Sequence, residues 1–325
     1  MGWTFTESID RFEAATASFL RAAPVENSVP LTVTAALRRR GADAYGDQPP
    51  RFGWWRPDPA RPDGAERHRQ EPGEQELDGR GPVEAVVLCT PPRPLLLTRA
   101  PEAAARELAA AWEGAVPGLT GDREAALVFA EAWRERTGEA ADIRREMRIY
   151  RLGELTARTP APPGRSRPAG PDDRELLLRW HHAYSLDVGD LPMGGERLVD
   201  DALAHGGRRL WETPDGVPVA MAGSTVPVDG MARILSVYTP PDHRGRGYAG
   251  AVTAAVSQAA LDAGAGVVLL NADLANPVTN GLYQRLGYRQ VRDHVSLAFM
   301  AAEGQAEPAD RSDRSEQAEP SEQAG

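Results

Sequence analysis

Three glycines and two arginines stand close together in the stretch TPPDHRGRGYAG. Gly245, Gly247 and Gly250 spell G-x-G-x-x-G, and Arg244 and Arg246 add positive charge beside them. Glycine lets the backbone approach a phosphate with no Cβ in the way, and arginine pairs with phosphate oxygens. These residue types at this spacing indicate a loop that binds an anion.

The sequence on either side of the loop predicts the elements that hold it. MARILSVYT (231–239) is typical of a strand, and GYAGAVTAAVSQAALDAG predicts a helix that Gly264 is placed to end. The first turn of a helix has N–H groups without intrahelical partners, and the helix dipole favours negative charge there. GVVLLNAD follows as a continuous apolar run typical of a buried parallel strand. The position within a β-α-β unit therefore favours a phosphate cradle.

Three other interpretations of the loop deserve comparison. An RNA-binding tail needs a disordered Arg-Gly repeat, whereas this stretch is a single copy between a strand and a helix. A Rossmann dinucleotide site needs its first glycine directly after the strand and a carboxylate about 20 residues further on. Here Thr239 to Arg244 intervene, and Asp273 is only loosely placed. A plain turn remains open as the purely structural interpretation of the glycines.

Two motifs together resemble the GNAT N-acetyltransferase superfamily. Its acetyl-CoA loop follows the pattern [QR]-x-x-G-x-[GA], which Arg244, Gly247 and Ala249 match. Its later helix follows N-x-x-x-x-x-L-Y-x-[KR]-x-G-[FY], and NPVTNGLYQRLGY matches it at Asn276, Leu282, Tyr283, Arg285, Gly287 and Tyr288. The resemblance covers about residues 165–300. It implies an α/β fold with a mixed sheet flanked by helices, the acyl-CoA N-acyltransferase fold.

The resemblance also implies which residues bind acetyl-CoA as cosubstrate. The main chain of Val237, Tyr238 and Thr239 would pair with the pantetheine arm. The pyrophosphate would be bound by the loop, residues Arg244, Gly245, Arg246, Gly247, Tyr248, Ala249 and Gly250. Asn276 and Asn280 would lie near the pantetheine, and a helix N-cap role for Asn276 is a compatible alternative.

The resemblance makes Tyr283 the catalytic proton donor to the leaving thiolate, since a tyrosine hydroxyl can hydrogen-bond to it. Helical spacing puts Tyr283 about 100° from the Leu282 and Leu286 face, so it need not lie in the core, although a packing role stays open. The base that deprotonates the amine is left open among Glu212, Tyr238, Asp273 and Asp293. His181 and His182 are further candidates for the acceptor pocket.

Composition excludes several other classes of function. The chain has 325 residues, a net charge of −10 and a pI near 5.2, which argues against general nucleic-acid or anionic-membrane partners and mildly favours a cationic acceptor. It contains no lysine, which excludes a P-loop lysine and a Schiff-base lysine. The single Cys89 fits a reducing compartment and a buried, inert thiol. No His, Cys and carboxylate cluster has metal-ligand spacing. With no signal peptide or membrane span in the pattern, we expect a cytoplasmic protein.

Composition shifts divide the chain into three parts. Residues 1–155 run in a GNAT-like order of elements but lack a glycine loop after PLLLT, so we predict a degenerate GNAT-like domain. Residues 156–300, which open on a Pro- and Gly-rich linker, form the predicted catalytic domain. Residues 301–325 are predicted to be a disordered acidic tail.

The resulting hypothesis is a tandem of two GNAT-like halves with one working site. It would transfer the acetyl group of acetyl-CoA to a primary amine on a small molecule or peptide by direct attack on the thioester. The alternative is a non-catalytic acyl-CoA-binding sensor or interaction module. The sequence predicts neither the acceptor amine nor the oligomeric state.

Overall fold

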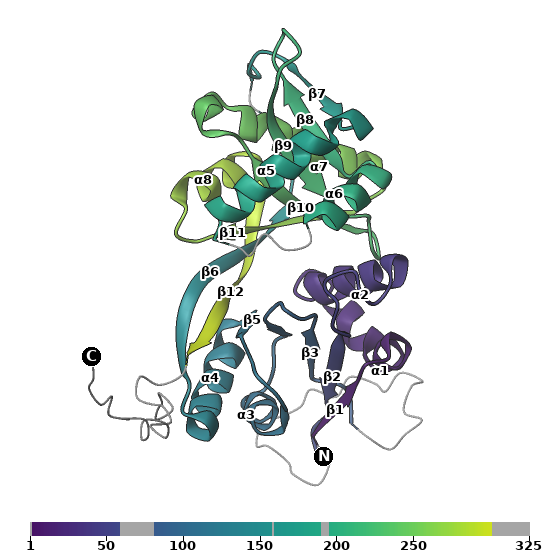
Figure 1. Cartoon of the computed structure of the whole chain (residues 1–325), viewed down its shortest axis with the longest axis vertical. Helices are drawn as coiled ribbons and strands as arrows, with labels where there is room; N and C mark the ends of the chain where they lie inside the picture. Colours follow the sequence, from purple (N-terminus) through teal and green to yellow (C-terminus); the bar gives the residue numbers. More distant parts are fainter. Residues whose placement is uncertain (1, 59–80, 158, 190–194, 301–325) are drawn as a thin grey trace, which may run out of the picture.

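The computed structural model describes residues 2–58, 81–157, 159–189 and 195–300. Within them the strands form one mixed sheet of twelve in the order β1-β2-β3-β4-β5-β12-β6-β11-β10-β9-β8-β7. Helices flank this sheet in each of two stacked halves (Figure 1). The predicted α/β class with a mixed sheet flanked by helices is therefore confirmed. The predicted acidic tail lies outside the described residues.

The N-terminal half holds one end of the sheet. Its strands are β1 (Trp3–Thr6), β2 (Arg51–Trp55), β3 (Ala85–Cys89), β4 (Leu95–Leu97) and β5 (Gly118–Asp122). Its helices are α1 (Ile9–Ala22), α2 (Ser28–Arg40), α3 (Glu102–Ala111) and α4 (Arg123–Thr137). The first helix, α1, follows β1 directly along the chain.

The C-terminal half holds the other end. Its strands are β7 (Arg165–Pro168), β8 (Arg208–Glu212), β9 (Pro218–Ser224), β10 (Met231–Tyr238) and β11 (Val267–Asp273). Its helices are α5 (Arg174–Asp187), α6 (Gly195–Ala204), α7 (Tyr248–Asp262) and α8 (Pro277–Arg285). An Asp-Gly turn joins β8 and β9 as an antiparallel hairpin. As predicted, β10 and β11 pair in parallel across α7, and Gly264 follows the end of α7 with φ +89°.

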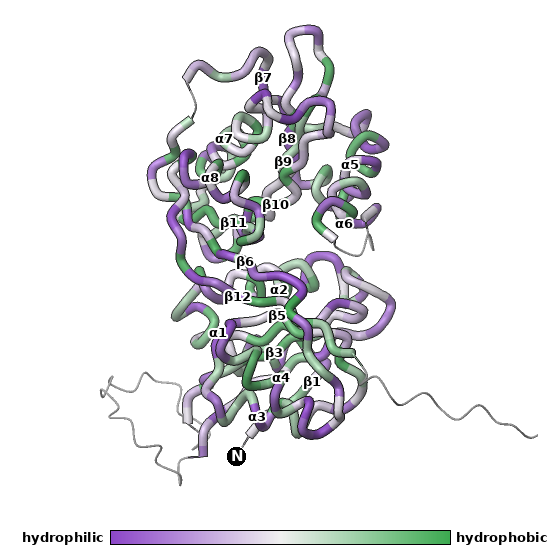
Figure 2. The backbone as a smooth tube through the Cα atoms, turned by 90° about the vertical axis from the view of Figure 1, so that its left-hand side faces the viewer, coloured by the Kyte–Doolittle hydropathy of each residue, from purple (hydrophilic) through white to green (hydrophobic). Residues whose placement is uncertain are grey.

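Two long strands exchange partners between the halves. β6 (Ala140–Leu152) follows α4 of the N-terminal half but inserts between β11 and β12. β12 (Tyr288–Met300) follows α8 of the C-terminal half but inserts between β5 and β6. In Figures 1 and 2 both strands run where the two halves meet. Each half therefore completes its sheet with the last strand of the other.

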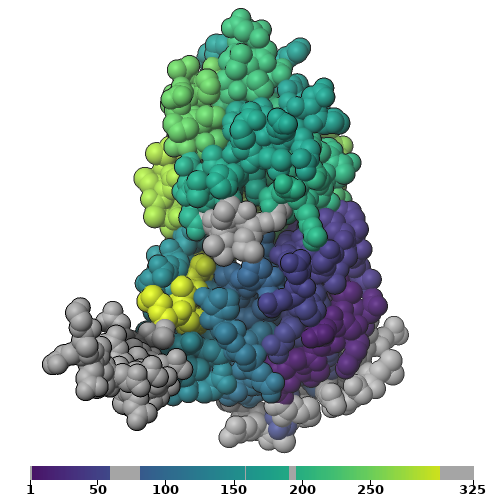
Figure 3. Space-filling model, viewed as in Figure 1, coloured from purple at the N-terminus to yellow at the C-terminus, as the bar shows by residue number. Residues whose placement is uncertain are grey.

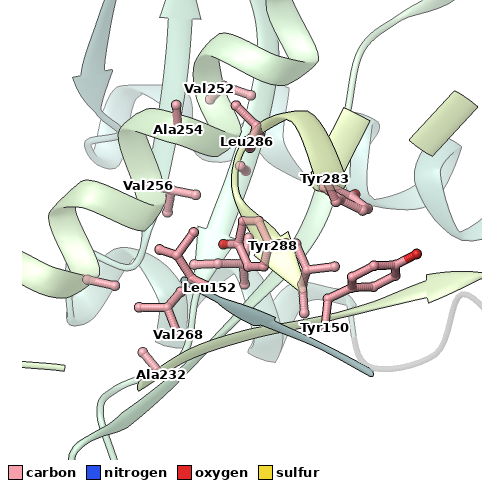
Figure 4. Packing of buried hydrophobic residues seen from close by; sticks show 14 of the residues in the cluster. Tyr150, Leu152, Ala232, Val252, Ala254, Val256, Val268, Tyr283, Leu286 and Tyr288 are labelled. Atoms are coloured by element: carbon pink, nitrogen blue, oxygen red, sulfur yellow. The ribbon is translucent and has the colours of Figure 1, made fainter. Parts of the chain in front are cut away.

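The cores confirm this exchange. Tyr150 and Leu152 of β6 are buried among side chains of α7, α8 and β11 in the C-terminal half, as Figure 4 shows. Val295 and Leu297 of β12 are buried against α3 and α4 in the N-terminal half. Each half therefore buries residues of the other, and one continuous sheet joins them. Figure 3 shows the two halves packed together, coloured from purple at the N-terminus to yellow at the C-terminus.

Candidate active site

The site begins where the two parallel strands of the C-terminal half diverge. β10 and β11 pair over four positions, from Met231 opposite Val267 to Ile234 opposite Leu270. Beyond this point β10 continues to Tyr238 without pairing to β11, while β11 continues to Asp273 paired only with β6. One edge of the last residues of β10 therefore keeps main-chain groups available to a ligand between the strands.

A bulge turns the end of β10 away from its neighbour. Leu235 lies opposite Gly223 of β9, but the next register partner is Tyr238, and Ser236 between them has φ +50°. A positive φ is uncommon for a residue other than glycine. Val237 is half-buried on the far side of the bulge, and Thr239 is buried with no hydrogen-bond partner for its Oγ1 in the described chain. The pantetheine-binding residues inferred from the resemblance therefore lie at the divergence.

The glycine loop follows directly. A short turn (Pro241–His243) leads to Gly245 with φ +77° and Gly247 with φ +89°, and α7 begins at Tyr248. Gly247 is the N-cap, so no side chain caps the first-turn N–H groups, which include that of Ala249. An added Cβ on Gly245 would meet open space. The loop thus presents bare backbone donors at a helix N-terminus, as an anion cradle requires.

Gly250 has a different reason to be glycine. A Cβ there would lie 2.9 Å from Cδ1 of Leu282 on α8. This glycine allows α7 and α8 to approach each other, and its α-carbon faces the other helix rather than a ligand. Its N–H still belongs to the first turn of α7. Of the three glycines of the G-x-G-x-x-G, two serve loop conformation and one serves helix packing.

The two arginines of the loop differ in their contacts. Arg244 donates from Nε to the Thr239 carbonyl at 2.9 Å, forms an ion pair with Asp187 of α5 and lies 5.9 Å from the ring centroid of Tyr238. Arg244 therefore fastens the loop to α5 and β10. Arg246 is exposed and has no ion-pair partner within the described ranges, so it is the more available charge for a phosphate.

The asparagines ahead of α8 are both held by the protein. Asn276 caps α8, since its Oδ1 accepts from the Thr279 N–H at 3.1 Å. Asn280 donates to the carbonyls of Asp273 and Asn276, each at 2.7 Å, and accepts from the Tyr150 hydroxyl at 2.8 Å. The predicted cap of Asn276 is confirmed, and Asn280 ties α8 to β11 and β6. Neither contact tests their proximity to pantetheine, which stays a prediction.

Tyr283 lies in the core rather than off it. Its side chain is 7% exposed and packs between the rings of Tyr150 and Tyr288, at 6.4 and 6.1 Å between centroids (Figure 4). Burial, with smaller contributions from Tyr184 and Tyr288, raises the pKa of its hydroxyl. That hydroxyl has no hydrogen-bond partner among the residues described. The ring therefore packs, and a neutral donor remains available at its end.

Two of the four candidate bases are committed to ion pairs. Glu212 is buried beside Arg167, which donates to its Oε1. Asp293 accepts two hydrogen bonds from Arg148 at 2.6 and 2.7 Å, and these lower the pKa of its carboxyl. A carboxylate with a lowered pKa is a poor acceptor of an amine proton.

The other candidate bases remain near the divergence. Burial raises the pKa of Tyr238, which keeps its hydroxyl protonated at neutral pH. Asp273 ends β11, where its Oδ1 accepts from the Ala275 N–H at 2.8 Å and its Oδ2 lies 3.7 Å from Arg145. His181 is half-buried and His182 exposed. The geometry favours none of these as the base.

One buried charged residue near the candidate site was not predicted from the sequence. Arg208 begins β8 and is 2% exposed, and its Nε and Nη1 have no hydrogen-bond partner in the described residues. Tyr184 of α5 is its electrostatic neighbour and also that of Tyr283. RRLWET predicts a strand but not which of its arginines is buried, because either face of the alternation fits the pattern.

Two kinds of site are absent from the described residues. No group of three His, Cys, Asp or Glu side chains there lies close enough to hold a metal ion. No helix in the same ranges is both long and apolar enough to span a bilayer.

Comparison with known proteins finds one family model that matches part of the C-terminal half. The model of the acetyltransferase (GNAT) family matches residues 176–288. That range includes most of α5, the glycine loop and α8, which lie around the candidate site. No curated protein matches the sequence significantly.

One solved structure extends the likeness in fold to most of the chain. A Drosophila protein is similar over 92% of this chain and 98% of its own, with 13% identity and a TM-score of 0.61. A GCN5-related N-acetyltransferase from Kribbella flavida matches 66% of this chain and 86% of its own, at 21% identity and a TM-score of 0.47. A Clostridium acetobutylicum structure described as a predicted acetyltransferase with acetyl-CoA matches 39% of this chain and 90% of its own, at 20% identity and a TM-score of 0.33. The Drosophila structure shows that this protein shares its two-half fold. At sequence identities this low, the likeness concerns the fold and not the function.

Proposed function

We propose that this chain, whose residues 176–288 match the model of the acetyltransferase (GNAT) family, transfers the acetyl group of acetyl-CoA to a primary amine. The observation that carries the proposal is the divergence of β10 and β11 beside a glycine loop that opens α7. This arrangement offers a slot with unpaired main-chain groups for the pantetheine arm and backbone N–H groups for the pyrophosphate.

The residues fit acetyl-CoA in three respects. The end of β10 has an unpaired edge and a buried, unpartnered Thr239 Oγ1. The loop has open space over Gly245, where a Cβ would otherwise stand. Arg246 supplies an available positive charge, which suits a pyrophosphate in an otherwise acidic protein. When bound, acetyl-CoA supplies an activated acyl group as its thioester.

The reaction forms one bond and breaks one. The neutral amine nitrogen attacks the acyl carbon, the new N–C bond forms, and the C–S bond breaks to leave a thiolate. The amine loses a proton to a base or to water, and the thiolate gains one. No carboxylate is assigned as the base, since Glu212 and Asp293 are held in ion pairs and Asp273 accepts from the Ala275 N–H beside Arg145.

We assign Tyr283 a hydrogen bond to the leaving sulfur. Its raised pKa keeps the phenol neutral at pH 7, so it can donate. The same raised pKa makes full proton transfer to a thiolate of pKa near 8.5 unfavourable. The tyrosine therefore stabilises the developing charge by hydrogen bonding, and the proton finally bound by sulfur comes from solvent.

The experiment that tests the proposal separates binding from turnover. Calorimetry with acetyl-CoA measures binding, and thiol detection over a panel of primary amines measures release of CoA. We expect binding and amine-dependent release. Binding without release for any amine would favour the alternative, a non-catalytic acyl-CoA sensor, and absence of binding would refute both.

A further inference from the structure

An unpaired positive charge is buried beside the site. Arg208 is 2% exposed, and two of its three guanidinium nitrogens, Nε and Nη1, are shielded from water with no hydrogen-bond partner among the described residues. No carboxylate in those residues forms an ion pair with it. Buried charges in proteins are nearly always paired, because an isolated ion loses its hydration without compensation. A guanidinium in this state needs an anion from elsewhere.

The backbone makes room for this guanidinium. Arg208 lies opposite Gly223 of β9, and a Cβ on Gly223 would be 2.3 Å from Nη1. Any larger residue at Gly223 would displace the side chain. The charge is therefore seated directly over the sheet instead of reaching solvent as arginines usually do.

The Arg208 guanidinium lies over Gly223, next to the part of β10 that borders the candidate active site. Gly223 is also the register partner of Leu235, the residue at which the β10 bulge begins and one beyond the last pair with β11. Tyr184 of α5 is an electrostatic neighbour of both Arg208 and the catalytic candidate Tyr283. The buried charge and the proposed hydrogen-bond donor therefore both lie close enough to the same tyrosine to interact with it electrostatically.

A second arginine shares this face. Arg233 of β10 lies two residues from Leu235, donates to Thr32 Oγ1 of α2 at 3.2 Å and has no ion-pair partner among the described carboxylates. Burial lowers the pKa of both arginines, that of Arg208 to about 10, so Arg208 remains charged at neutral pH. The face between α5 and α2 therefore carries two arginines that pair with no described carboxylate, although the chain has a net charge of −10.

We propose that the acceptor of the proposed acetyl transfer is an amine that also carries a carboxylate, an amino-acid-type molecule, and that Arg208 binds this carboxylate. The inference rests on the proposed function for the amine and reverses the expectation of a cationic acceptor drawn from net charge. A carboxylate matches the fork of a guanidinium, and pairing in a dry site is strong. The acceptor therefore completes an ion pair that the described residues do not provide.

Matched pairs of acceptors test the proposal. Thiol release is measured with the standard amino acids and with their carboxamides, which keep the amine and lose the charge. We expect kcat/KM for the preferred free acid to exceed that of its amide by on the order of 10²-fold in the wild type. In Arg208→Gln this preference should fall to within about 3-fold, chiefly through KM. Arg209→Gln is the control, because Arg209 follows Arg208 on β8 and is held by Ser166; it should keep the preference.

Two measurements need no turnover. First, Arg208→Met should leave Tm unchanged or raise it without ligand, since it removes an unpaired buried charge; a structural arginine would lower Tm on replacement. Second, free acids should raise the Tm of the wild type more than the amides do, and this difference should vanish in Arg208→Gln.

Failure of the two proposals is distinguishable. Equal effects of acids and amides on both rate and Tm, or a large loss of Tm in Arg208→Met, overturn the carboxylate site even if amines are acetylated. Acid-specific stabilisation that depends on Arg208, without CoA release from any amine, supports the carboxylate site and refutes acetyl transfer.

Discussion

The two halves contain the same β-α-β unit and differ at the turn between strand and helix. In the C-terminal half, β10 and β11 separate after four paired positions, and a loop with two positive-φ glycines leads into α7. In the N-terminal half, all three residues of β4 pair with β5, and Thr98 to Pro101 lead into α3 without a glycine. The topology is common to both, so the fold alone does not create the anion site.

Closure of the N-terminal unit has visible causes. Gly121 of β5 lies so close to β4 that a Cβ would be 2.5 Å from the Leu97 carbonyl oxygen. Thr98, which follows β4, accepts from the Val86 N–H at 2.9 Å and so ties the turn to β3. Because β4 and β5 stay paired, the described N-terminal unit has no gap between the strands for a pantetheine arm. Its turn, which Thr98 holds to β3, also has no glycine loop for a pyrophosphate. We therefore expect the chain to bind one acetyl-CoA, in the C-terminal half.

The largest effect should come from Gly247→Glu. Gly247 has φ +89°, which strains any side chain, and a carboxylate would face the pyrophosphate. We expect affinity for acetyl-CoA to fall by on the order of 10³-fold, measured by calorimetry.

Two controls isolate the cradle. Gly264→Glu introduces the same strain at φ +89° beyond the other end of α7 and should destabilise the protein without weakening acetyl-CoA binding. Pro101→Glu puts a carboxylate at the equivalent position of α3 and should also leave affinity unchanged. Loss of affinity in Pro101→Glu would mean that the N-terminal half binds the ligand.

The second effect concerns whether the halves are independent units. Leu297 of β12 is 1% exposed in the core of the N-terminal half, although its strand continues from α8 of the C-terminal half. Leu297→Ala should reduce the free energy of unfolding by about 2–5 kcal/mol, because it leaves a cavity. Denaturant unfolding followed by hydrogen exchange should show β3 and β9 losing protection together.

A matched control uses a strand that stays in its own half. Val87→Ala on β3 also leaves a cavity in the N-terminal core, since Val87 is fully buried. It should likewise destabilise β9, because β6 and β12 couple the halves. Separate transitions for β3 and β9 would show that the exchanged strands do not couple them.

The third effect tests Tyr283 by chemistry. Tyr283→Phe should lower kcat by about 10²-fold and leave the KM for acetyl-CoA unchanged, because only the hydrogen bond to the leaving sulfur is lost. Stability should change little, since that hydroxyl has no partner among the described residues.

Tyr288→Phe is the opposite case. The Tyr288 hydroxyl is buried and hydrogen-bonded to Ser257 at 2.7 Å, so its removal should cost about 1 kcal/mol of stability and leave kcat unchanged. If Tyr283→Phe behaves like Tyr288→Phe, Tyr283 is a packing residue only.

The contrast between the halves also marks how far the sequence predicts the structure. The glycine loop, α7, the β8–β9 hairpin and the N-cap at Asn276 follow from local patterns, since turn and cap chemistry is encoded within a few residues. The missing glycine loop of the N-terminal half is evident from the sequence, but the closure of β4 on β5 was not predicted, nor were the strands β1, β2, β5 and β7. They are short, and β7 (RSRP) lacks any apolar alternation.

The strand exchange was not predictable for a different reason. Only residues 147–152 of β6 suggest a strand, because its first part is largely polar and exposed where it leaves the N-terminal half. Which strand it pairs with depends on contacts distant in sequence. The burial of Arg208 and of Tyr283 likewise depends on how α5 and the sheet pack together.

The smallest effect probes the seam between the halves. His294 lies on β12, near Arg233 of β10, Asp122 of β5 and Asp293 beside it. Burial, with a further contribution from Arg233, lowers the pKa of His294 from 6.5 to about 4. The folded protein keeps this imidazole neutral, while the unfolded chain takes up a proton as the pH falls below 6.5. His294 therefore reduces stability progressively between pH 6.5 and about 4, and the loss levels off below that.

His294→Gln removes this titration. Between pH 6.5 and 4 the free energy of unfolding of the variant should fall by about 2 kcal/mol less than that of the wild type, measured by urea unfolding at each pH. His182→Gln is the control, because His182 is exposed on α5 and should leave the pH profile unchanged. If the free energy of unfolding of His294→Gln falls with pH as steeply as that of the wild type, His294 is not shielded from water. The contact between the two halves would then be hydrated, unlike the cores on either side. The two halves would then be joined by the strands β6 and β12 but not by a dry interface.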